Sequence, residues 1–342
     1  MVQRVLVTGA NGFVGGHVCK RLAHGGVDVV GTVQCSESVS KLPHEFQPIV
    51  TGDICADFDW SSALDGVDAV VHLAARTHVV RDRTRDPLSA YRRVNVAGTK
   101  NLLSACKAAN VSRFLFLSSI KAVGEGASVR YSESTICKPA DAYGISKRET
   151  ELCIAELTRE TSTKPIIIRS PLVYGPGVRG NFCSLMKLID RGLPLPVASV
   201  RNSRSVIFVD NLADAIASTL THPAAIGETF HVADDRPIST PELIGQIAVM
   251  LQRRQRMFAC PVSALTFAAR LLKQSGRAKR LTGSLTVSTE KIHRLLAWTP
   301  SISFETGLRR TVEWFQTNGG QSHPAAFVSD RDVEYRDVDR AA

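Results

Sequence analysis

The chain has 342 residues, of which 44% are apolar, and its formal charge at neutral pH is +10. This composition is typical of a globular protein with one large or two modest domains, and it excludes extensive disorder. No apolar run approaches the roughly 20 residues that span a bilayer, and the first apolar run starts at residue 4, so we expect a cytoplasmic protein without a signal peptide or a transmembrane segment.

Strands and helices alternate through the first half of the chain. Runs rich in valine and isoleucine predict six strands, at 5–8, 27–33, 48–51, 69–73, 114–118 and 166–169. Apolar residues at helical spacing between them predict helices at 14–23, 88–109 and 146–158. Nearly continuous apolar strands that alternate with helices favour an α/β fold whose parallel sheet is covered on both faces, the doubly wound architecture.

The regular alternation ends near Pro171, after which proline and glycine become frequent. We therefore expect a doubly wound domain over 1–170 and a smaller mixed α/β domain over 171–317 that holds the substrate. The glycine-rich and charged end of the chain predicts a flexible tail over 318–342.

Basic residues are concentrated late in the chain, with eight of them and no acidic residue between Arg253 and Arg280. Apolar residues at helical spacing lie among them, and such a helix could rest on an anionic membrane surface. We favour instead a helix packed on its own domain with its basic residues in solvent. No nucleic-acid-binding motif accompanies this segment. The apolar residues of the stripe are Ala264, Leu265, Ala268, Leu271 and Leu272.

The eight cysteines form no Cys-x-x-Cys pair and no cluster with histidine. Scattered cysteines of this kind are typical of reduced, structural thiols. We expect neither a disulfide framework nor a metal site.

Three glycines, Gly9, Gly12 and Gly15, join the first predicted strand to the first predicted helix. A tight turn here brings the backbone amides around 12–14 against a phosphate, with the positive end of the helix dipole behind them. The Gly-x-x-Gly-x-x-Gly spacing between a strand and a helix therefore predicts a dinucleotide-binding Rossmann fold.

The end of the second strand bears on the choice of dinucleotide. It reads Thr32-Val33-Gln34, without the acidic residue that accepts hydrogen bonds from the ribose of NAD. It also has no arginine for a 2′-phosphate. The sequence permits NAD or NADP, and we favour NADP. Asp53, after the third strand, is positioned to accept a hydrogen bond from the adenine amino group.

Tyr143 and Lys147 lie one turn apart on a predicted helix and share a face. A free tyrosine titrates near pH ~10, and an ammonium ~4 Å away in an effective dielectric of ~20 would stabilise the phenolate by about 4 kcal/mol. We therefore predict that Lys147 lowers the pKa of Tyr143 toward neutrality. Ser119 ends the fifth strand and would hydrogen-bond the same substrate oxygen. These three residues predict the proton transfer that accompanies hydride transfer.

These motifs together resemble the extended short-chain dehydrogenase/reductases, in particular the nucleotide-sugar 4-epimerases and 4-keto-sugar reductases of the NAD-dependent epimerase/dehydratase family. The resemblance extends to about Gln316 and includes 52–54, 72–75 and 94–99. It implies that Lys147 also holds the nicotinamide ribose. The cofactor-binding residues that it implies are Gly9, Asn11, Gly12, Phe13, Val14, Gly15, Asp53, Ile54, Ala74, Ala75, Asn95, Tyr143, Lys147 and Pro171.

The residues after Ser119 narrow the reaction. Ile120 and Lys121 follow it. This run resembles that of one subgroup of sugar reductases and epimerases in surface-polysaccharide pathways. Sugar 4,6-dehydratases place a Thr-Asp-Glu run at this point, so dehydration is disfavoured. The resemblance also implies that Asn181 and Arg204 contact the diphosphate of a sugar nucleotide. It suggests a further phosphate or ribose contact for Arg294, for which a surface ion pair is an equal alternative.

We favour a nucleotide-sugar oxidoreductase that transfers hydride between NAD(P)(H) and C4 of a UDP-linked hexose, as a 4-keto-6-deoxy-sugar reductase of surface-polysaccharide biosynthesis. The alternative is a UDP-hexose 4-epimerase, like UDP-glucose 4-epimerase, with tightly bound NAD. A non-catalytic dinucleotide-binding sensor and a reductase of non-sugar ketones are less favoured. The resemblance favours a homodimer, and we expect no nucleic-acid partner.

Overall fold

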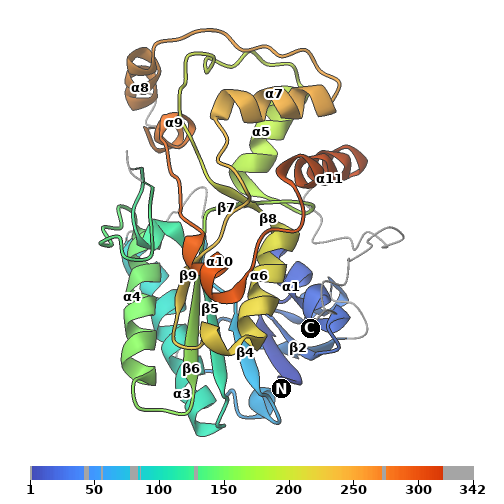
Figure 1. Cartoon of the computed structure of the whole chain (residues 1–342), viewed down its shortest axis with the longest axis vertical. Helices are drawn as coiled ribbons and strands as arrows, with labels where there is room; N and C mark the ends of the chain where they lie inside the picture. The colour runs from blue at the N-terminus through green and yellow to red at the C-terminus, as the bar shows by residue number, and fades with distance from the viewer. Residues whose placement is uncertain are drawn as a thin grey trace.

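A seven-stranded parallel sheet forms the base of the molecule (Figure 1). The computed structural model describes residues 2–41, 46–54, 57–77, 84, 86–126, 130–271 and 275–318. The strand order is β3-β2-β1-β4-β5-β6-β9, and every neighbouring pair is parallel. This topology confirms the predicted doubly wound α/β fold. The strands are β1 (Arg4–Thr8), β2 (Asp28–Val33), β3 (Gln47–Val50), β4 (Ala69–His72), β5 (Arg113–Ser119), β6 (Lys164–Ser170) and β9 (Thr229–His231).

Alternation along β1 divides the core into two layers, because successive side chains of a strand point to opposite faces of the sheet. Val5 and Val7 are buried with helices α1 (Phe13–His24) and α6 (Val209–Thr221). Leu6 is buried with α3 (Gly98–Ala108) and α4 (Ala142–Thr158) on the other face. Both faces are therefore covered, as near-continuous apolar strands require.

The single helix predicted over 88–109 is interrupted. The chain forms α2 (Pro87–Tyr91), then a π-helical segment (Arg92–Ala97), and only then α3. A π turn inserts one residue and turns the following helix. It brings Gly98 so close to the carbonyl oxygen of Ile54 that an added Cβ would lie 1.9 Å from that oxygen. Periodicity alone does not show such an insertion.

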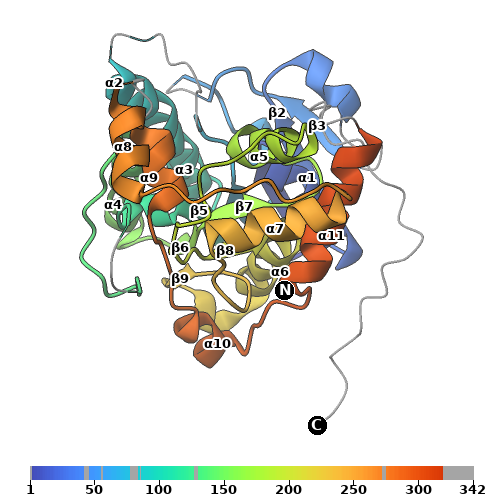
Figure 2. The same cartoon turned by 90° about the horizontal axis from the view of Figure 1, so that it is seen from above.

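A smaller body of helices lies beyond the carboxyl ends of the strands (Figure 1). Its own core packs around the two-stranded parallel sheet of β7 (Leu172–Tyr174) and β8 (Val206–Phe208). The outer end carries α8 and α9, which lie together and away from α11 in both views (Figure 2). The helices of this body are α5 (Gly180–Asp190), α7 (Thr240–Met250), α8 (Val262–Leu271), α9 (Ser275–Thr282) and α11 (Phe304–Thr317).

The chain returns to the large sheet after Pro171. Helix α6 packs beside α1, β9 pairs with β6, and α10 (Glu290–Leu296) packs against β9. Part of the region 171–317 therefore belongs to the large sheet and its helices. That this region binds the substrate stays a prediction. The predicted tail beyond residue 318 lies outside the described residues.

None of the helices in the described parts of the chain is both long enough and apolar enough to cross a bilayer.

Candidate active site

The glycine turn joins β1 to α1 at the carboxyl edge of the sheet. Gly9 has φ +70°, and an added Cβ there would lie 3.1 Å from the backbone of Ala74. An added Cβ at Gly15 would lie only 2.1 Å from the carbonyl oxygen of Gly9. The backbone N–H of Gly12 donates to that same oxygen at 2.9 Å. Glycine is therefore required at Gly9 and Gly15 by close backbone packing.

The outer side of this turn is open. An added Cβ at Gly12 would meet only the Gly9 carbonyl oxygen, at 3.0 Å. Helix α1 begins at Phe13, so the amides of its first turn have no partner within the helix. These features fit the pyrophosphate of a dinucleotide, which would take the place of a Gly12 side chain and accept from the amides at the positive end of the helix dipole.

The residues predicted for the adenosine end of the cofactor lie between the ends of β2 and β3. Gln34 Nε2 donates to Asp53 Oδ1 at 3.1 Å, and Arg93 lies 3.7 Å from the other carboxylate oxygen. Ile54 is buried against Gly98. Asp53 is thus already oriented by two side chains, while its contact with adenine stays a prediction.

Asn95 is fully buried and connects the loop after β4 to helix α4. Its Oδ1 accepts from the Arg76 backbone N–H at 2.8 Å, and its Nδ2 donates to Ser146 Oγ at 3.0 Å. The hydroxyl of Thr8 accepts from the backbone N–H groups of Leu73 and Ala74, both at 3.1 Å. Asn95 therefore positions the segment that carries Ala74 and Ala75 rather than facing open space.

The predicted catalytic residues meet at the carboxyl end of β5. The Ser119 hydroxyl hydrogen-bonds the phenol of Tyr143. Lys147 lies one turn along α4, and its Nζ is 6.0 Å from the centre of the Tyr143 ring. The same Nζ donates to the carbonyl oxygen of Leu117 at 2.8 Å and lies over the Phe116 ring. The three side chains therefore form one group, as predicted.

The protonation state of this group differs from the prediction. Burial and the negative charge of Asp141 raise the pKa of Tyr143 well above its ordinary value, although the Ser119 hydrogen bond opposes this. Burial also lowers the pKa of Lys147 to about 7, against the opposing charge of Glu151. The prediction that Lys147 makes Tyr143 acidic is wrong for this form of the protein, because it counted the attraction of the ammonium and ignored the loss of water around both groups.

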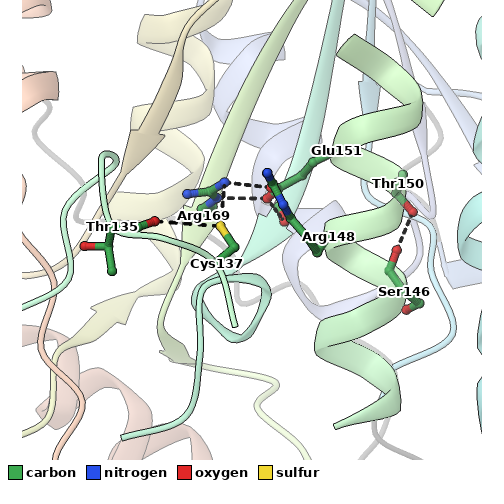
Figure 3. Close-up of polar contacts among 8 residues, drawn as sticks. Thr135, Cys137, Ser146, Arg148, Thr150, Glu151 and Arg169 are labelled. Carbon is green, nitrogen blue, oxygen red and sulfur yellow. Dashed lines mark hydrogen bonds and ion pairs between the residues drawn. The ribbon is translucent and has the colours of Figure 1, made fainter. Parts of the chain in front are cut away.

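Helix α4 is held on the sheet by a buried ion pair with β6 (Figure 3). Arg169 donates to both carboxylate oxygens of Glu151, at 2.9 and 2.7 Å. Ser118 Oγ donates to the same carboxylate at 2.6 Å. Because Glu151 follows Lys147 by one turn, these bonds fix the rotation of α4 and thereby the direction of Tyr143 and Lys147.

A polar cluster beside Tyr143 was not predicted from the sequence. Lys121 Nζ contacts the carboxylates of both Glu125 and Asp141, the latter at 2.5 Å. Burial alone would raise the pKa of Asp141, but its hydrogen bonds from Lys121 and the Gly144 N–H leave that pKa below its ordinary value. Asp141 also caps the N-terminus of α4. The signal in the sequence was an N-cap residue two positions before Tyr143, the predicted catalytic tyrosine.

The predicted substrate residues fall in different places. Arg204 donates to the carbonyl oxygen of Gly283 at 2.8 Å and lies within electrostatic reach of Glu125 and Arg280. It therefore belongs to the edge of the polar cluster. Asn181 is exposed in the first turn of α5. Arg294 lines a separate open cavity of about 680 Å³ beside β9, with Ser132, Glu133, Ser134, Ser288, Glu290, Lys291 and His293. The substrate contacts of all three residues stay predictions.

Known proteins share this combination of fold and motif. A family model described as the NAD dependent epimerase/dehydratase family matches residues 5–233. The chain belongs to the NAD dependent epimerase/dehydratase family. It is an enzyme of the short-chain dehydrogenase/reductase type, as the resemblance of its motifs predicted.

Individual relatives cover almost the whole chain. A UDP-glucose 4-epimerase of Vibrio cholerae is 36% identical over 318 residues, which are 92% of this chain and 96% of that protein. A dTDP-glucose 4,6-dehydratase of Streptomyces venezuelae, solved with NAD, has a TM-score of 0.74 and 26% identity, covering 93% of this chain and 98% of that one. A UDP-glucuronic acid 4-epimerase of Bacillus cereus, also solved with NAD, has a TM-score of 0.76 at 22% identity, covering 92% and 99%. This last likeness concerns the fold alone.

Proposed function

We propose that the protein is a UDP-hexose 4-epimerase, which inverts C4 of its sugar through a transient 4-keto sugar. The observation that carries the proposal is the grouping of Ser119, Tyr143 and Lys147 at the sheet edge that also holds the glycine turn. The relative from Vibrio cholerae, named as a UDP-glucose 4-epimerase, supports this reaction over the reduction that the sequence favoured.

The side chains divide the work of proton transfer. A bound nicotinamide dinucleotide supplies the hydride acceptor and donor. Ser119 and Tyr143 hydrogen-bond O4 of the sugar during each transfer. Between the two transfers the 4-keto sugar rotates, so that its other face is reduced. For this cycle the neutral phenol of Tyr143 first loses its proton to solvent. The phenolate then takes the O4 proton when the alcohol is oxidised and returns it when the ketone is reduced, so each cycle ends in the phenolate form in which it began. The Lys147 ammonium stabilises the phenolate at the start and at the end of each cycle.

One observation favours a second candidate, a 4-keto-sugar reductase of the surface-polysaccharide type. Tyr143 is a neutral phenol in this form of the protein because burial raises its pKa. A neutral phenol is the form that protonates O4 as a ketone is reduced. Dehydration has less support, since Lys121 holds the neighbouring carboxylates of Glu125 and Asp141 in ion pairs and an ionised carboxylate is not a general acid.

The predicted substrate residues and the relatives also bear on the choice of substrate and cofactor. We propose that Asn181 and Arg204 bind the diphosphate of a UDP-sugar, with dTDP as the alternative nucleotide, and that Arg294 adds a weaker contact. The NAD-bound dehydratase of 26% identity favours NAD over the NADP that the end of β2 suggested. We further expect a cytoplasmic homodimer, which sedimentation of the purified protein would test.

One pair of assays separates the candidates. The purified protein is incubated with UDP-glucose or UDP-N-acetylglucosamine without added dinucleotide, and the sugars are resolved by proton NMR. An epimerase interconverts the C4 epimers with no net change in reduced-nicotinamide absorbance. A reductase leaves them unchanged but consumes NADH or NADPH stoichiometrically with a UDP-4-keto-6-deoxy sugar. Inactivity in both assays would contradict both candidates and favour a binding role.

A further inference from the structure

Helix α8 shows an apolar face that no other described part of the chain covers. No residue of α8 is buried. Phe267 and Leu271 lie one turn apart on one face and remain 64% and 71% exposed. The opposite face, with Leu265 and Ala269, is half-buried, and α9 packs against α8. The sequence favoured a helix packed on its own domain, whereas the structure only half-buries the Leu265 face and exposes Phe267 and Leu271.

The segment that leads into α8 extends this surface. Phe258 is 49% exposed and Val262 is 38% exposed. Phe258 lies in the segment between α7 and α8, and Val262 is the first residue of α8. Figures 1 and 2 show this segment at the outer end of the molecule. Exposed phenylalanine and leucine side chains grouped in this way are unusual for a surface that only meets water.

Exposed basic residues share this part of the chain with the apolar side chains. Residues 251–289 contain no aspartate or glutamate. The exposed basic side chains of this stretch include Arg254, Arg256, Arg270, Lys279 and Arg280. On the α8 helix itself, Arg270 precedes Leu271 and stands beside the exposed face, so cationic and apolar groups can meet the same partner.

We propose that α8 and the segment before it dock on an anionic lipid bilayer surface, with Phe267 and Leu271 in the headgroup region and the basic residues over acidic headgroups. Apolar side chains that enter the interface and cations that neutralise acidic lipids are the two terms that hold peripheral helices to membranes. A second copy of the chain fits less well, because a symmetric contact would bring two basic surfaces together. The proposal is independent of the reaction that the enzyme catalyses.

Vesicle sedimentation tests this surface directly. The full-length protein is mixed with extruded vesicles of phosphatidylcholine alone or of phosphatidylcholine with phosphatidylglycerol, at low and high salt. We expect binding to the mixed vesicles only, and weaker binding at high salt because salt screens the basic residues. The double variant Phe267→Glu/Leu271→Glu should lower the partition coefficient about tenfold or more. Absence of wild-type binding at low salt would overturn the proposal.

Matched variants separate docking from folding. Ile226→Glu places a glutamate at an exposed apolar residue outside this surface and should leave vesicle binding unchanged. Arg270→Gln/Lys279→Gln alters only exposed cations, so it should weaken binding to anionic vesicles even if the glutamate variant fails to fold. If the glutamate variant instead lowers the sedimenting mass of the protein and neither it nor the wild type binds vesicles, the face is a subunit contact and the proposal is wrong.

Discussion

Tyr143 and Lys147 show how one buried environment acts on two side chains in opposite ways. Burial disfavours the charged form of each, so it raises the pKa of the phenol and lowers that of the amine. The result is a neutral tyrosine and a lysine that titrates near neutral pH. In this form of the protein, Tyr143 is therefore a proton donor, and Lys147 loses its proton and its positive charge near neutral pH.

Replacement of Tyr143 tests its role as proton donor. Tyr143→Phe keeps the ring and removes the hydroxyl, so kcat should fall by about 10²- to 10⁴-fold with an unchanged circular dichroism spectrum. Tyr91→Phe is the control, because its ring lies 6.0 Å from that of Tyr143 and its hydroxyl donates to the Thr77 carbonyl. Equal losses in the two variants would contradict a specific role for Tyr143.

The lowered pKa of Lys147 has a consequence for stability. Above about pH 7 the folded protein holds this lysine neutral, whereas the unfolded chain keeps it protonated up to about pH 10. The unfolded state then binds more protons, so this term makes the folded state more stable as pH rises, by at most about 1.4 kcal/mol per pH unit. We expect urea unfolding of Lys147→Met at pH 7, 8 and 9 to lack this slope. A parallel pH dependence in both proteins would show that Lys147 does not titrate in this range.

At the scale of single elements, the first turn of α1 depends on close backbone packing. The positions of Gly9 and Gly15 against each other and against Ala74 leave no space for a side chain. In the same way, the ion pair between Glu151 and Arg169 sets the rotation of α4 (Figure 3). The close packing of the turn positions backbone amides, and the ion pair positions the side chains of α4. Both sets of groups lie at the carboxyl edge of the sheet, where ligands of such folds bind.

A methyl group at either end of α1 tests the turn. Gly15→Ala places a Cβ 2.1 Å from the Gly9 carbonyl oxygen, so the turn must shift and dinucleotide affinity should fall about tenfold or more. Gly25→Ala, at the other end of the helix, places its Cβ at 3.2 Å from a carbonyl oxygen and serves as the control. Isothermal titration with NAD compares the two, and equal affinities would contradict the role of the turn.

At the scale of the whole molecule, Asn211 joins helix α6, which packs on the large sheet, to the segment before α11. It is fully buried on α6, its Nδ2 donates to Asp234 Oδ1 and to the Ile302 carbonyl, and its Oδ1 accepts from the Ile302 N–H. The segment before α11 is therefore fastened to a helix of the sheet. Because α11 also packs on α5 and α7, this residue links both bodies.

Loss of that link should lower the stability of the whole protein. Asn211→Ala leaves buried partners unsatisfied, and the free energy of unfolding should fall by about 3 kcal/mol. Asn181→Ala, at an exposed position, should change it by less than about 0.5 kcal/mol. Urea unfolding monitored by tryptophan fluorescence measures both. A small effect of Asn211→Ala would show that the C-terminal segment is held by other contacts.

The sequence by itself determined the parallel sheet, the glycine turn and the grouping of Ser119, Tyr143 and Lys147. These features are carried by patterns within a few residues, namely apolar periodicity, the spacing of Gly9, Gly12 and Gly15, and one helical turn between a tyrosine and a lysine. Only the tertiary structure decided the protonation of Tyr143, the contacts of Lys121 and the exposure of α8. The protonation of Tyr143 and the exposure of α8 depend on how much water distant segments remove, and the Lys121–Asp141 contact depends on which segments pack together. Neither leaves a local pattern in the chain.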